Sequence, residues 1–257
     1  MSKTIAIAGK GGVGKTTLTG LMIQYLIAHG KTPILAVDAD ANSNLNEVLG
    51  VEVEMTLGQI REVVERAADA KENPIPAGIS RGDYMEMMFQ RCIIEDDDFD
   101  MLVMGRTQGK GCYCYVNGLL QAQVAKLAPH YPWVVVDNEA GLEHISRGIL
   151  PSVDYLILVS DPSRRGVQAA GRIAQLAKEV GLKPEKSGVI INRAPGGRVS
   201  EGTMEEIRTQ GLTLLGCVPH DDMVYEYDCD GKPTVTLPED SPVRKAVYQV
   251  MDSLQPG

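Results

Sequence analysis

Seven short apolar runs recur along the chain, mostly ending in small or acidic residues. The runs lie at 4–9, 33–38, 99–105, 133–137, 155–161, 188–192 and 214–219. Continuous apolar runs of this length are typical of strands that are buried on both faces. Helical patterns separate most of them, for example at 15–29, 164–180 and 200–210. The alternation predicts an α/β fold with a mostly parallel sheet of about seven strands and helices on both faces.

The stretch from about 52 to 98 breaks this rhythm, and we interpret it as a helical insertion within a single domain spanning 1–257. The last predicted element is a helix after Ser241, which can cap it, with Pro242 in its first turn. One face of this helix is apolar, which predicts packing on the body of the domain. The face comprises Val243, Ala246, Val247, Val250, Met251 and Leu254.

Composition narrows the function classes. The chain has 257 residues and a formal net charge of −9, and an acidic surface repels nucleic acid and anionic lipid. We therefore expect no nucleic-acid and no membrane partner. Five cysteines are too few for a disulfide framework, and the chain runs from Met1 directly into its first predicted strand without a signal peptide. These features predict a cytoplasmic protein whose closely spaced cysteines serve metal or redox chemistry.

The segment GKGGVGKTT at 9–17 places a glycine-rich loop between a predicted strand and a predicted helix. It satisfies the P-loop pattern, in which glycines let the backbone approach phosphate and the helix N-terminus adds unpaired N–H groups. We expect Lys15 to bind the β- and γ-phosphates, Thr16 to bind Mg²⁺ and Thr17 to contact the α-phosphate. The rest of the loop completes the phosphate site through Gly11, Gly12, Val13 and Gly14.

A second lysine, Lys10, stands inside this loop. Here the chain resembles the deviant Walker A ATPases, a family that includes cell-division and plasmid-partition ATPases, the iron protein of nitrogenase and metal-insertion ATPases. In that family the early lysine reaches across a dimer to the partner's nucleotide. The resemblance implies ATP hydrolysis, a catalytic role for Lys10 beside Lys15, and a homodimer that encloses its nucleotides.

Three aspartates follow two of the predicted strands. Asp38 and Asp40 are two residues apart at a strand end, so they point the same way into the crevice at the carboxyl edge of the sheet. In the family pattern Asp40 orients the attacking water and Asp38 supports the Mg²⁺ shell; the alternative is a turn with structural aspartates. The segment WVVVDNEAG resembles the Walker B strand and second switch, which implies that Asp137 holds Mg²⁺ through water and that Gly141 is a hinge.

Residues after the last two predicted strands are expected near the base. The resemblance places Asn192 at the base, with Pro219 and Asp221 in the adenine-flanking loop. A guanine site usually reads Asn-Lys-x-Asp, whereas here the fourth position is Pro195. The aspartate that would take the guanine edge is missing, which favours ATP over GTP.

Cys112 and Cys114 lie one residue apart, just ahead of a predicted helix. A helix N-terminus lowers thiol pKa values and favours thiolate, and a disulfide across one residue would be strained. Two thiolates make half of a tetrahedral metal site. A two-fold axis duplicates any residue beside it, so a symmetric partner could supply the other half. We therefore predict a metal site shared across a dimer, with nickel or zinc as the ion.

The same loop resembles that of the carbon monoxide dehydrogenase accessory ATPases, which insert nickel, and of their relatives that serve acetyl-CoA synthase. These proteins combine GKGGVGKT, a Cys-x-Cys in this interval and a second switch of the EAGLEHISRG type, in the order found here. The resemblance implies an ATP-hydrolysing metallochaperone, and apo carbon monoxide dehydrogenase or acetyl-CoA synthase as its client.

Two other functions stay open at the level of sequence. An ATP-dependent reductase like the nitrogenase iron protein would hold a [4Fe–4S] cluster, but that family draws its cysteines from separate segments. A partition or positioning ATPase is disfavoured by the acidic charge, and by DNEAGLEHISRG, in which a proline common to partition ATPases is missing. The remaining cysteines, Cys92, Cys217 and Cys229, are interpreted as packing or incidental residues.

Overall fold

The predicted apolar runs form neighbouring strands of one sheet in the computed structural model, which describes residues 2–42, 44–66, 73–106, 114–140 and 152–254. Within these residues the sheet has eight strands in the order β3-β4-β2-β5-β1-β6-β7-β8. Every neighbouring pair is parallel except β3 with β4. The strands are β1 (Lys3–Gly9), β2 (Ile34–Ala39), β3 (Ile93–Glu95), β4 (Phe99–Val103), β5 (Trp133–Asn138), β6 (Tyr155–Ser160), β7 (Lys186–Ala194) and β8 (Leu214–Pro219).

The α/β class and the mostly parallel sheet are confirmed, with one strand more than the seven that the runs predict. The additional strand is β3, a three-residue antiparallel strand at the sheet edge, within the interval interpreted as a helical insertion. That interval also holds two helices. The helices are α1 (Lys15–Ala28), α2 (Leu45–Leu49), α3 (Leu57–Arg66), α4 (Arg81–Gln90), α5 (Cys114–Leu127), α7 (Arg164–Glu179), α8 (Glu201–Thr209), α9 (Asp222–Cys229) and α10 (Pro242–Leu254).

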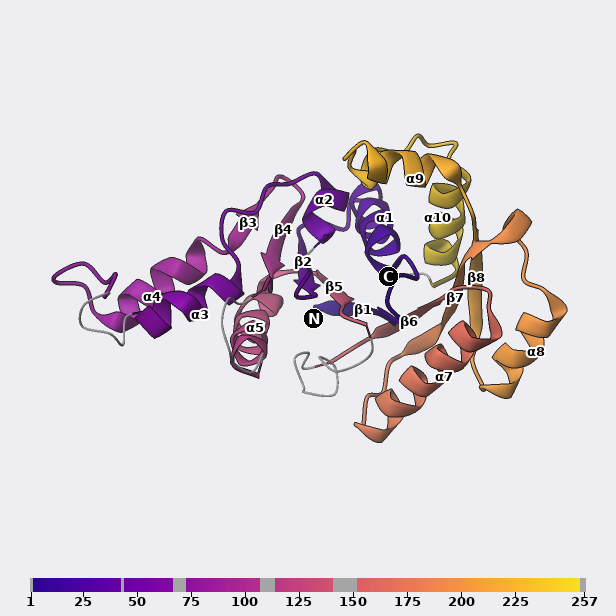
Figure 1. The fold of residues 1–257 in the computed structure, drawn as a ribbon, viewed down its shortest axis with the longest axis horizontal. Coiled ribbons are helices and arrows are strands. Elements are labelled where there is room, and N and C mark those ends of the chain that lie inside the picture. The colour runs from indigo at the N-terminus through magenta and orange to yellow at the C-terminus, as the bar shows by residue number, and fades with distance from the viewer. Residues whose placement is uncertain (1, 43, 67–72, 107–113, 141–151, 255–257) are drawn as a thin grey trace.

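Helices cover both faces of the sheet, because the strands are apolar on both faces. Ile5 and Ile7 of β1 join a core cluster with α1 and α10, whereas Ala6 and Ala8 face a second cluster that includes α5 and α7. Figure 1 shows α1, α9 and α10 above the sheet and α5 and α7 below it. The carboxyl ends of the parallel strands meet at one edge between these two layers, which is where doubly wound folds bind their ligands.

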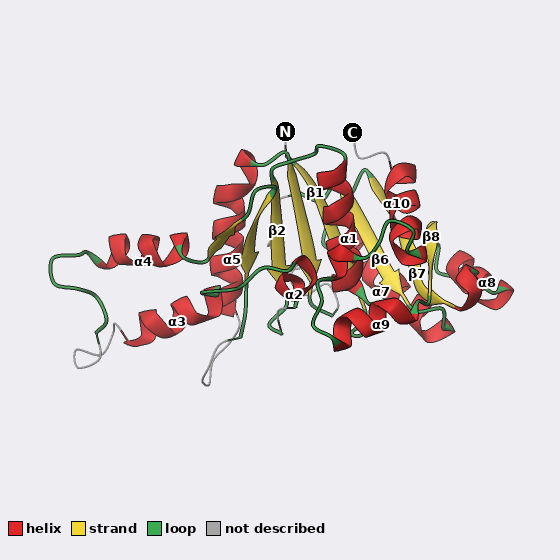
Figure 2. Ribbon diagram, turned by 90° about the horizontal axis from the view of Figure 1, so that it is seen from above, coloured by secondary structure: helices red, strands yellow, loops and turns green. Residues whose placement is uncertain are grey.

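Helices α3 and α4 form an extension that we call the arm. Figure 2 shows both helices at one end of the molecule, extending beyond α5. Helix α4 begins with Ser80, whose Oγ accepts a hydrogen bond from Asp83 N at 3.1 Å. Its only buried residue is Met88. Helix α4 therefore buries far less apolar surface than the helices that lie on the sheet, whereas α3 is anchored in the core by Leu57 and Ile60.

The C-terminal helix packs as its pattern predicts. Ser241 Oγ accepts a hydrogen bond from Arg244 N at 3.4 Å, which is the expected cap. Five of the six predicted face residues are buried and Ala246 is partly buried against the same cluster. Across the described residues, none of the helices has both the length and the apolar character needed to span a bilayer.

Candidate nucleotide site

The site lies where the central strands end. Asp38 of β2 lies opposite Asp137 of β5 in the strand register, and Gly9 of β1 lies beside Val159 of β6. A Cβ added at Gly9 would lie 2.3 Å from the carbonyl oxygen of Val159, so only glycine fits at the start of the loop. The sheet register therefore brings the P-loop and two carboxylates to one edge.

The P-loop is held in shape by the end of β7. The Asn192 Nδ2 donates to the carbonyl oxygen of Val13 at 2.8 Å, and the Arg193 Nη1 donates to that of Gly12 at 3.2 Å. Gly14 has φ +88°, and a Cβ there would lie 2.4 Å from Asn192 Nδ2. Glycine is required on both counts. A loop fixed before phosphate arrives loses little freedom on binding it.

Asn192 was predicted to lie at the base, and in the structure its side-chain amide bonds the backbone on both sides. Its Oδ1 accepts a hydrogen bond from Arg193 N at 2.9 Å, while its Nδ2 bonds the P-loop. The residue also lines the base side of the cleft described next. Contact with the base stays a prediction.

Two adjoining cavities form a cleft above this edge. One, of about 570 Å³, has mainly polar walls and contains seven of the predicted residues together with Asn42, Glu47, Glu139 and Lys232. The predicted residues in its wall are Gly11, Gly12, Gly14, Lys15, Thr16, Thr17 and Asp40, of which Lys15 is nearly buried. A second cavity, of about 280 Å³, continues from Gly14 and Thr17 toward α9. We call the first the phosphate cavity and the second the base side of the cleft, after the groups that the sequence predicts for them.

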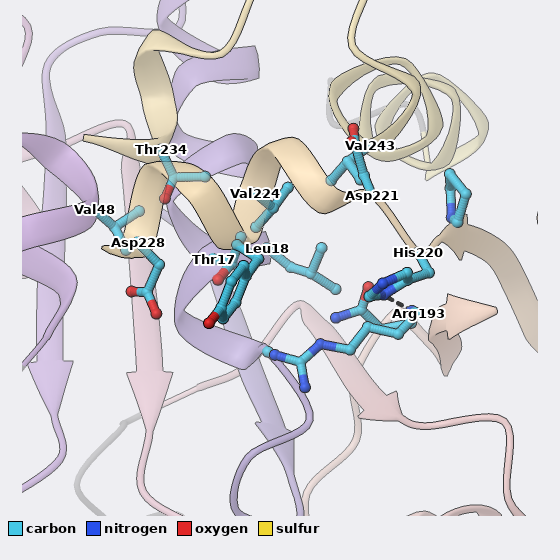
Figure 3. Close-up of a pocket in the computed structure, with 14 residues that line it drawn as sticks. Thr17, Leu18, Val48, Arg193, His220, Asp221, Val224, Asp228, Thr234 and Val243 are labelled. Atoms are coloured by element: carbon cyan, nitrogen blue, oxygen red, sulfur yellow. Dashed lines mark hydrogen bonds between the residues drawn. The ribbon is translucent and has the colours of Figure 1, made fainter. Parts of the chain in front are cut away.

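The base side of the cleft has an apolar wall. Leu18, Val48, Val224 and Val243 line it, and the predicted Pro219 and Asp221 lie there too. Figure 3 shows Thr17, Leu18 and Val224 close together among the residues that line this cavity. Asp221 also caps α9, because its Oδ1 accepts a hydrogen bond from Met223 N at 3.0 Å. An apolar wall with few polar groups is the environment that a purine ring prefers.

Asp38 and Asp137 form a buried carboxylate pair beneath the phosphates. Burial raises the pKa of Asp137 to about 7, and the nearby Asp38 carboxylate adds to the rise, while a hydrogen bond with Thr16 and the charge of Lys15 oppose it. Burial likewise raises the pKa of Asp38 to about 6. Two adjacent buried carboxylates disfavour ionisation unless a cation is present.

These oxygens fit Mg²⁺. The ion prefers hard oxygen ligands, and it is usually held by one or two carboxylates, waters and substrate phosphates rather than by an all-protein cage. Thr16 and Asp137 would hold it directly or through water, with Asp38 behind them. When bound, Mg²⁺ neutralises charge on the phosphates during transfer.

Asp38 has a second task, which is to hold the following turn. Its Oδ1 accepts a hydrogen bond from Asp40 N, and its Oδ2 accepts from Asn44 N and Leu45 N, each at 3.0 Å. Asp40 is less buried and reaches the phosphate cavity. The two aspartates therefore differ in geometry: one organises the turn, and the other faces the place where the γ-phosphate would lie.

Sequence reasoning missed several residues of the cleft. Arg193, Asp228, Thr234 and Val48 line both cavities, and the exposed Tyr225 lines the base side. Arg193 has φ +54°, which is unusual for a residue other than glycine and is a typical feature of functional sites. Its position directly after Asn192 was an available signal. The others belong to α2 and to the α9 region, where no motif marks them.

Lys10 is exposed and lines neither cavity of its own chain, and Val13 is buried with only its backbone facing the loop. Cys112 lies outside the described residues. Cys114 is the first residue of α5. Cys92 is fully buried and Cys229 is exposed, with Cys217 between these extremes. The described residues contain no group of three or more His, Cys, Asp or Glu side chains placed to hold a metal ion.

A parallel sheet that ends in a glycine-rich loop, with carboxylates on the neighbouring strands, defines a P-loop nucleotide hydrolase. The chain belongs to the family described as CobQ/CobB/MinD/ParA nucleotide binding domain, whose model matches residues 4–235. With its complete P-loop and this nucleotide binding domain, the chain is an ATPase, and its site is consistent with ATP and Mg²⁺.

Relatives match along nearly the whole chain. An uncharacterized ATP-binding protein of Methanocaldococcus jannaschii is 42% identical over 250 residues, which cover 97% of each chain. The carbon monoxide dehydrogenase accessory protein CooC of Rhodospirillum rubrum is 28% identical over 88% of this chain and 87% of its own. The septum site-determining protein MinD of Pyrococcus horikoshii, solved with Mg-ADP, has the same fold, with a TM-score of 0.72 at 23% identity over 100% of this chain and 97% of that one.

Proposed function

We propose that this ATPase is a metallochaperone. It binds a metal ion, nickel in our interpretation, at Cys112 and Cys114 in a site shared across an ATP-dependent homodimer, and it delivers the ion to carbon monoxide dehydrogenase or acetyl-CoA synthase. The Cys-x-Cys itself and the likeness to a carbon monoxide dehydrogenase accessory protein over most of both chains support this assignment.

One structural observation carries the proposal: the strand that leads to the cysteine pair is fastened to the nucleotide edge. Strand β4 pairs with β2, which ends in Asp38. The backbone bonding continues past the strand, since Met104 N donates to the carbonyl oxygen of Asp38 at 2.9 Å. Helix α5 then begins at Cys114. A change in the turn after Asp38 can therefore act on the cysteine segment through one strand end.

Two features support the homodimer: the exposed Lys10, and the number of metal ligands that one chain supplies. Lys10 is exposed beside a phosphate cavity that its own side chain does not line, so it is available to a partner's nucleotide. Two thiolates per chain are half of a four-thiolate site, and two-fold symmetry supplies the rest. The same contact between subunits would thus complete both the catalytic site and the metal site.

The proposed cycle couples ATP binding and hydrolysis to metal binding and release, and the coupling free energy that it needs is ordinary. ATP binding draws the subunits together and gathers four thiolates, and hydrolysis separates them and releases the ion to the client. Asp40 orients the attacking water, and Lys15 with Lys10 stabilises charge on the phosphates. A thousandfold change in metal affinity corresponds to about 4 kcal/mol, which is within the range that nucleotide binding supplies.

A positioning ATPase is the second candidate. MinD proteins match this chain in sequence, for example that of Thermotoga maritima at 26% identity over 94% of this chain. This function predicts ATP-dependent binding to anionic vesicles or DNA, which a cosedimentation assay would detect. An iron–sulfur reductase is the third reading, and iron and sulfide analysis of anaerobically purified protein would identify it.

Native mass spectrometry tests the proposal. Anaerobic protein is mixed with Ni²⁺ and either ADP or ATP, and the Cys112→Ser/Cys114→Ser variant is compared with Cys229→Ser, which alters an exposed cysteine on α9. We expect one nickel per dimer in the wild type and in Cys229→Ser, and none in the double variant. A dimer that binds nickel equally well without Cys112 and Cys114 would contradict the proposal.

A further inference from the structure

Arg106 stands where three parts of the molecule meet. It follows the end of β4, it precedes the cysteine segment in the sequence, and it lines a small cavity with Ala41, Asn42 and Glu139. Asn42 and Glu139 also line the phosphate cavity. Arg106 thus lies beside the nucleotide cleft, next to two of its wall residues, in a segment that carries no part of the P-loop or Walker B motifs.

The Arg106 side chain bonds the turn that carries Asp40. Its Nη2 donates a hydrogen bond to Asn42 Oδ1. Asn42 in turn donates to Asp40 Oδ1, from its backbone N at 2.8 Å and from its Nδ2 at 3.3 Å. The guanidinium therefore orients the amide of Asn42 so that its oxygen faces Arg106 and its nitrogen faces the Asp40 carboxylate.

The backbone of Arg106 is held by the base of the arm. Gly58 N of α3 donates to the carbonyl oxygen of Met104 at 2.8 Å. A Cβ at Gly58 would lie 2.4 Å from the carbonyl oxygen of Arg106, so α3 contacts this segment directly. Gly105, at φ +67°, has the Thr56 side chain against it. An arginine on a fixed backbone can hold a neighbour in one geometry, as precise catalytic sites require.

From these contacts we propose that Arg106 is a positioning residue for ATP hydrolysis, which acts through Asn42 on Asp40 and ties the hydrolytic step to the base of the arm. The inference rests on the proposed role of Asp40 in orienting the attacking water, and it does not depend on metal transport. Displacement of α3, for example by a client, would move Arg106 and thereby change the rate of hydrolysis.

The test is a mutant cycle on steady-state ATP hydrolysis. Arg106→Ala and Asn42→Ala should each lower kcat about tenfold with KM for ATP within about twofold, because the ground-state contacts to ATP stay intact. The double variant should also be about tenfold slower, because both changes interrupt the same chain of hydrogen bonds from Arg106 through Asn42 to Asp40. Arg106→Lys should recover most of the loss. Arg172→Ala, which removes an exposed arginine of α7, is the matched control and should hydrolyse ATP normally.

Two results would overturn the inference: a normal kcat in Arg106→Ala, or a double variant about a hundredfold slower, which would mean that the residues act separately. Asp40→Asn, measured alongside, separates this failure from that of the proposed function. If Asp40→Asn is slow while Arg106→Ala is normal, the inference alone fails. If Asp40→Asn hydrolyses ATP normally, the proposed role of Asp40 fails and the inference fails with it.

Discussion

The nucleotide edge and the arm are built in opposite ways. Helix α1, which follows the P-loop, buries most of its residues, and the loop is held by hydrogen bonds from the Asn192 amide and the Arg193 guanidinium of β7. Helix α4 of the arm buries Met88 alone. Well-packed elements hold a catalytic geometry, whereas sparsely packed ones open locally at low free-energy cost. The comparison suggests a division of labour, with a rigid site that hydrolyses ATP and an adaptable arm that responds to it or to a partner.

The largest expected effect lies at the rigid edge. Lys15→Ala should lower kcat/KM for ATP by at least about a thousandfold, because a preorganised charge at the phosphates is removed. Steady-state phosphate release measures it. Lys183→Ala, which alters an exposed lysine outside the cleft, should stay within about twofold of the wild type. Residual activity of a tenth or more in Lys15→Ala would place the catalytic charge elsewhere.

The second-largest effect is expected at Gly58, where the arm packs on the segment that follows β4. Gly58→Ala should lower the free energy of unfolding by about 2 kcal/mol, because its Cβ would press on the backbone oxygen of Arg106, which cannot move cheaply. Gly82→Ala in α4 is the matched control. Its Cβ would meet Ser80 Oγ at an ordinary 3.7 Å, so the change should be neutral or stabilising by up to about 1 kcal/mol. Equal urea midpoints for the two variants would contradict the tight packing at Gly58.

The raised pKa values of the buried carboxylates lead us to expect that the stability of the metal-free protein depends on pH. Because the pKa of Asp137 in the folded chain, about 7, lies above its ordinary value of 3.8, the folded state binds more protons than the unfolded state. Stability of the metal-free protein should therefore fall as the pH rises from about 4 through about 7. Asp137→Asn, which cannot ionise, should be about 1–2 kcal/mol more stable than wild type at pH 8.

Urea unfolding in EDTA at pH 8 and near pH 4 checks this sign, with the exposed Asp97→Asn as a control that should change nothing. The gain from Asp137→Asn should largely disappear near pH 4, because the wild-type carboxyl is then protonated in the folded state and the pH is close to its unfolded-state pKa of 3.8. A variant that is less stable than wild type at pH 8 would mean that the charged form of Asp137 is stabilised in the metal-free protein.

The smallest expected effect is in the arm. Backbone amides of α4 should exchange with deuterium at a lower opening free energy than those of α1, since few apolar contacts are lost when α4 opens. ATP should slow exchange in the α1 region more than in α4. Hydrogen-exchange mass spectrometry resolves the two helices, and equal protection of α4 and α1 would remove the distinction between the regions.

Much of the fold could be predicted because continuous apolar runs report burial on both faces, and all seven runs became strands. Strand β3 was not predicted, because Ile93–Glu95 is too short to show a hydrophobic pattern. The P-loop is local in sequence and was therefore visible. Arg193 and Asp228 reach the cleft from distant segments, and Arg106 reaches Asn42 in its wall, so their roles depend on tertiary placement. For Asn192 the strand-end position was predicted, but not its bond to the Val13 carbonyl.

The measurement that tests the central claim most directly is the affinity for nickel in two nucleotide states. Anaerobic protein is titrated with Ni²⁺ against a coloured chelator, once with ADP and once with a non-hydrolysable ATP analogue. The proposed function predicts one nickel per two chains, a Kd that differs at least tenfold between the two states, and loss of binding in Cys112→Ser/Cys114→Ser. An equal Kd in both states, or nickel binding that survives loss of both cysteines, would contradict it.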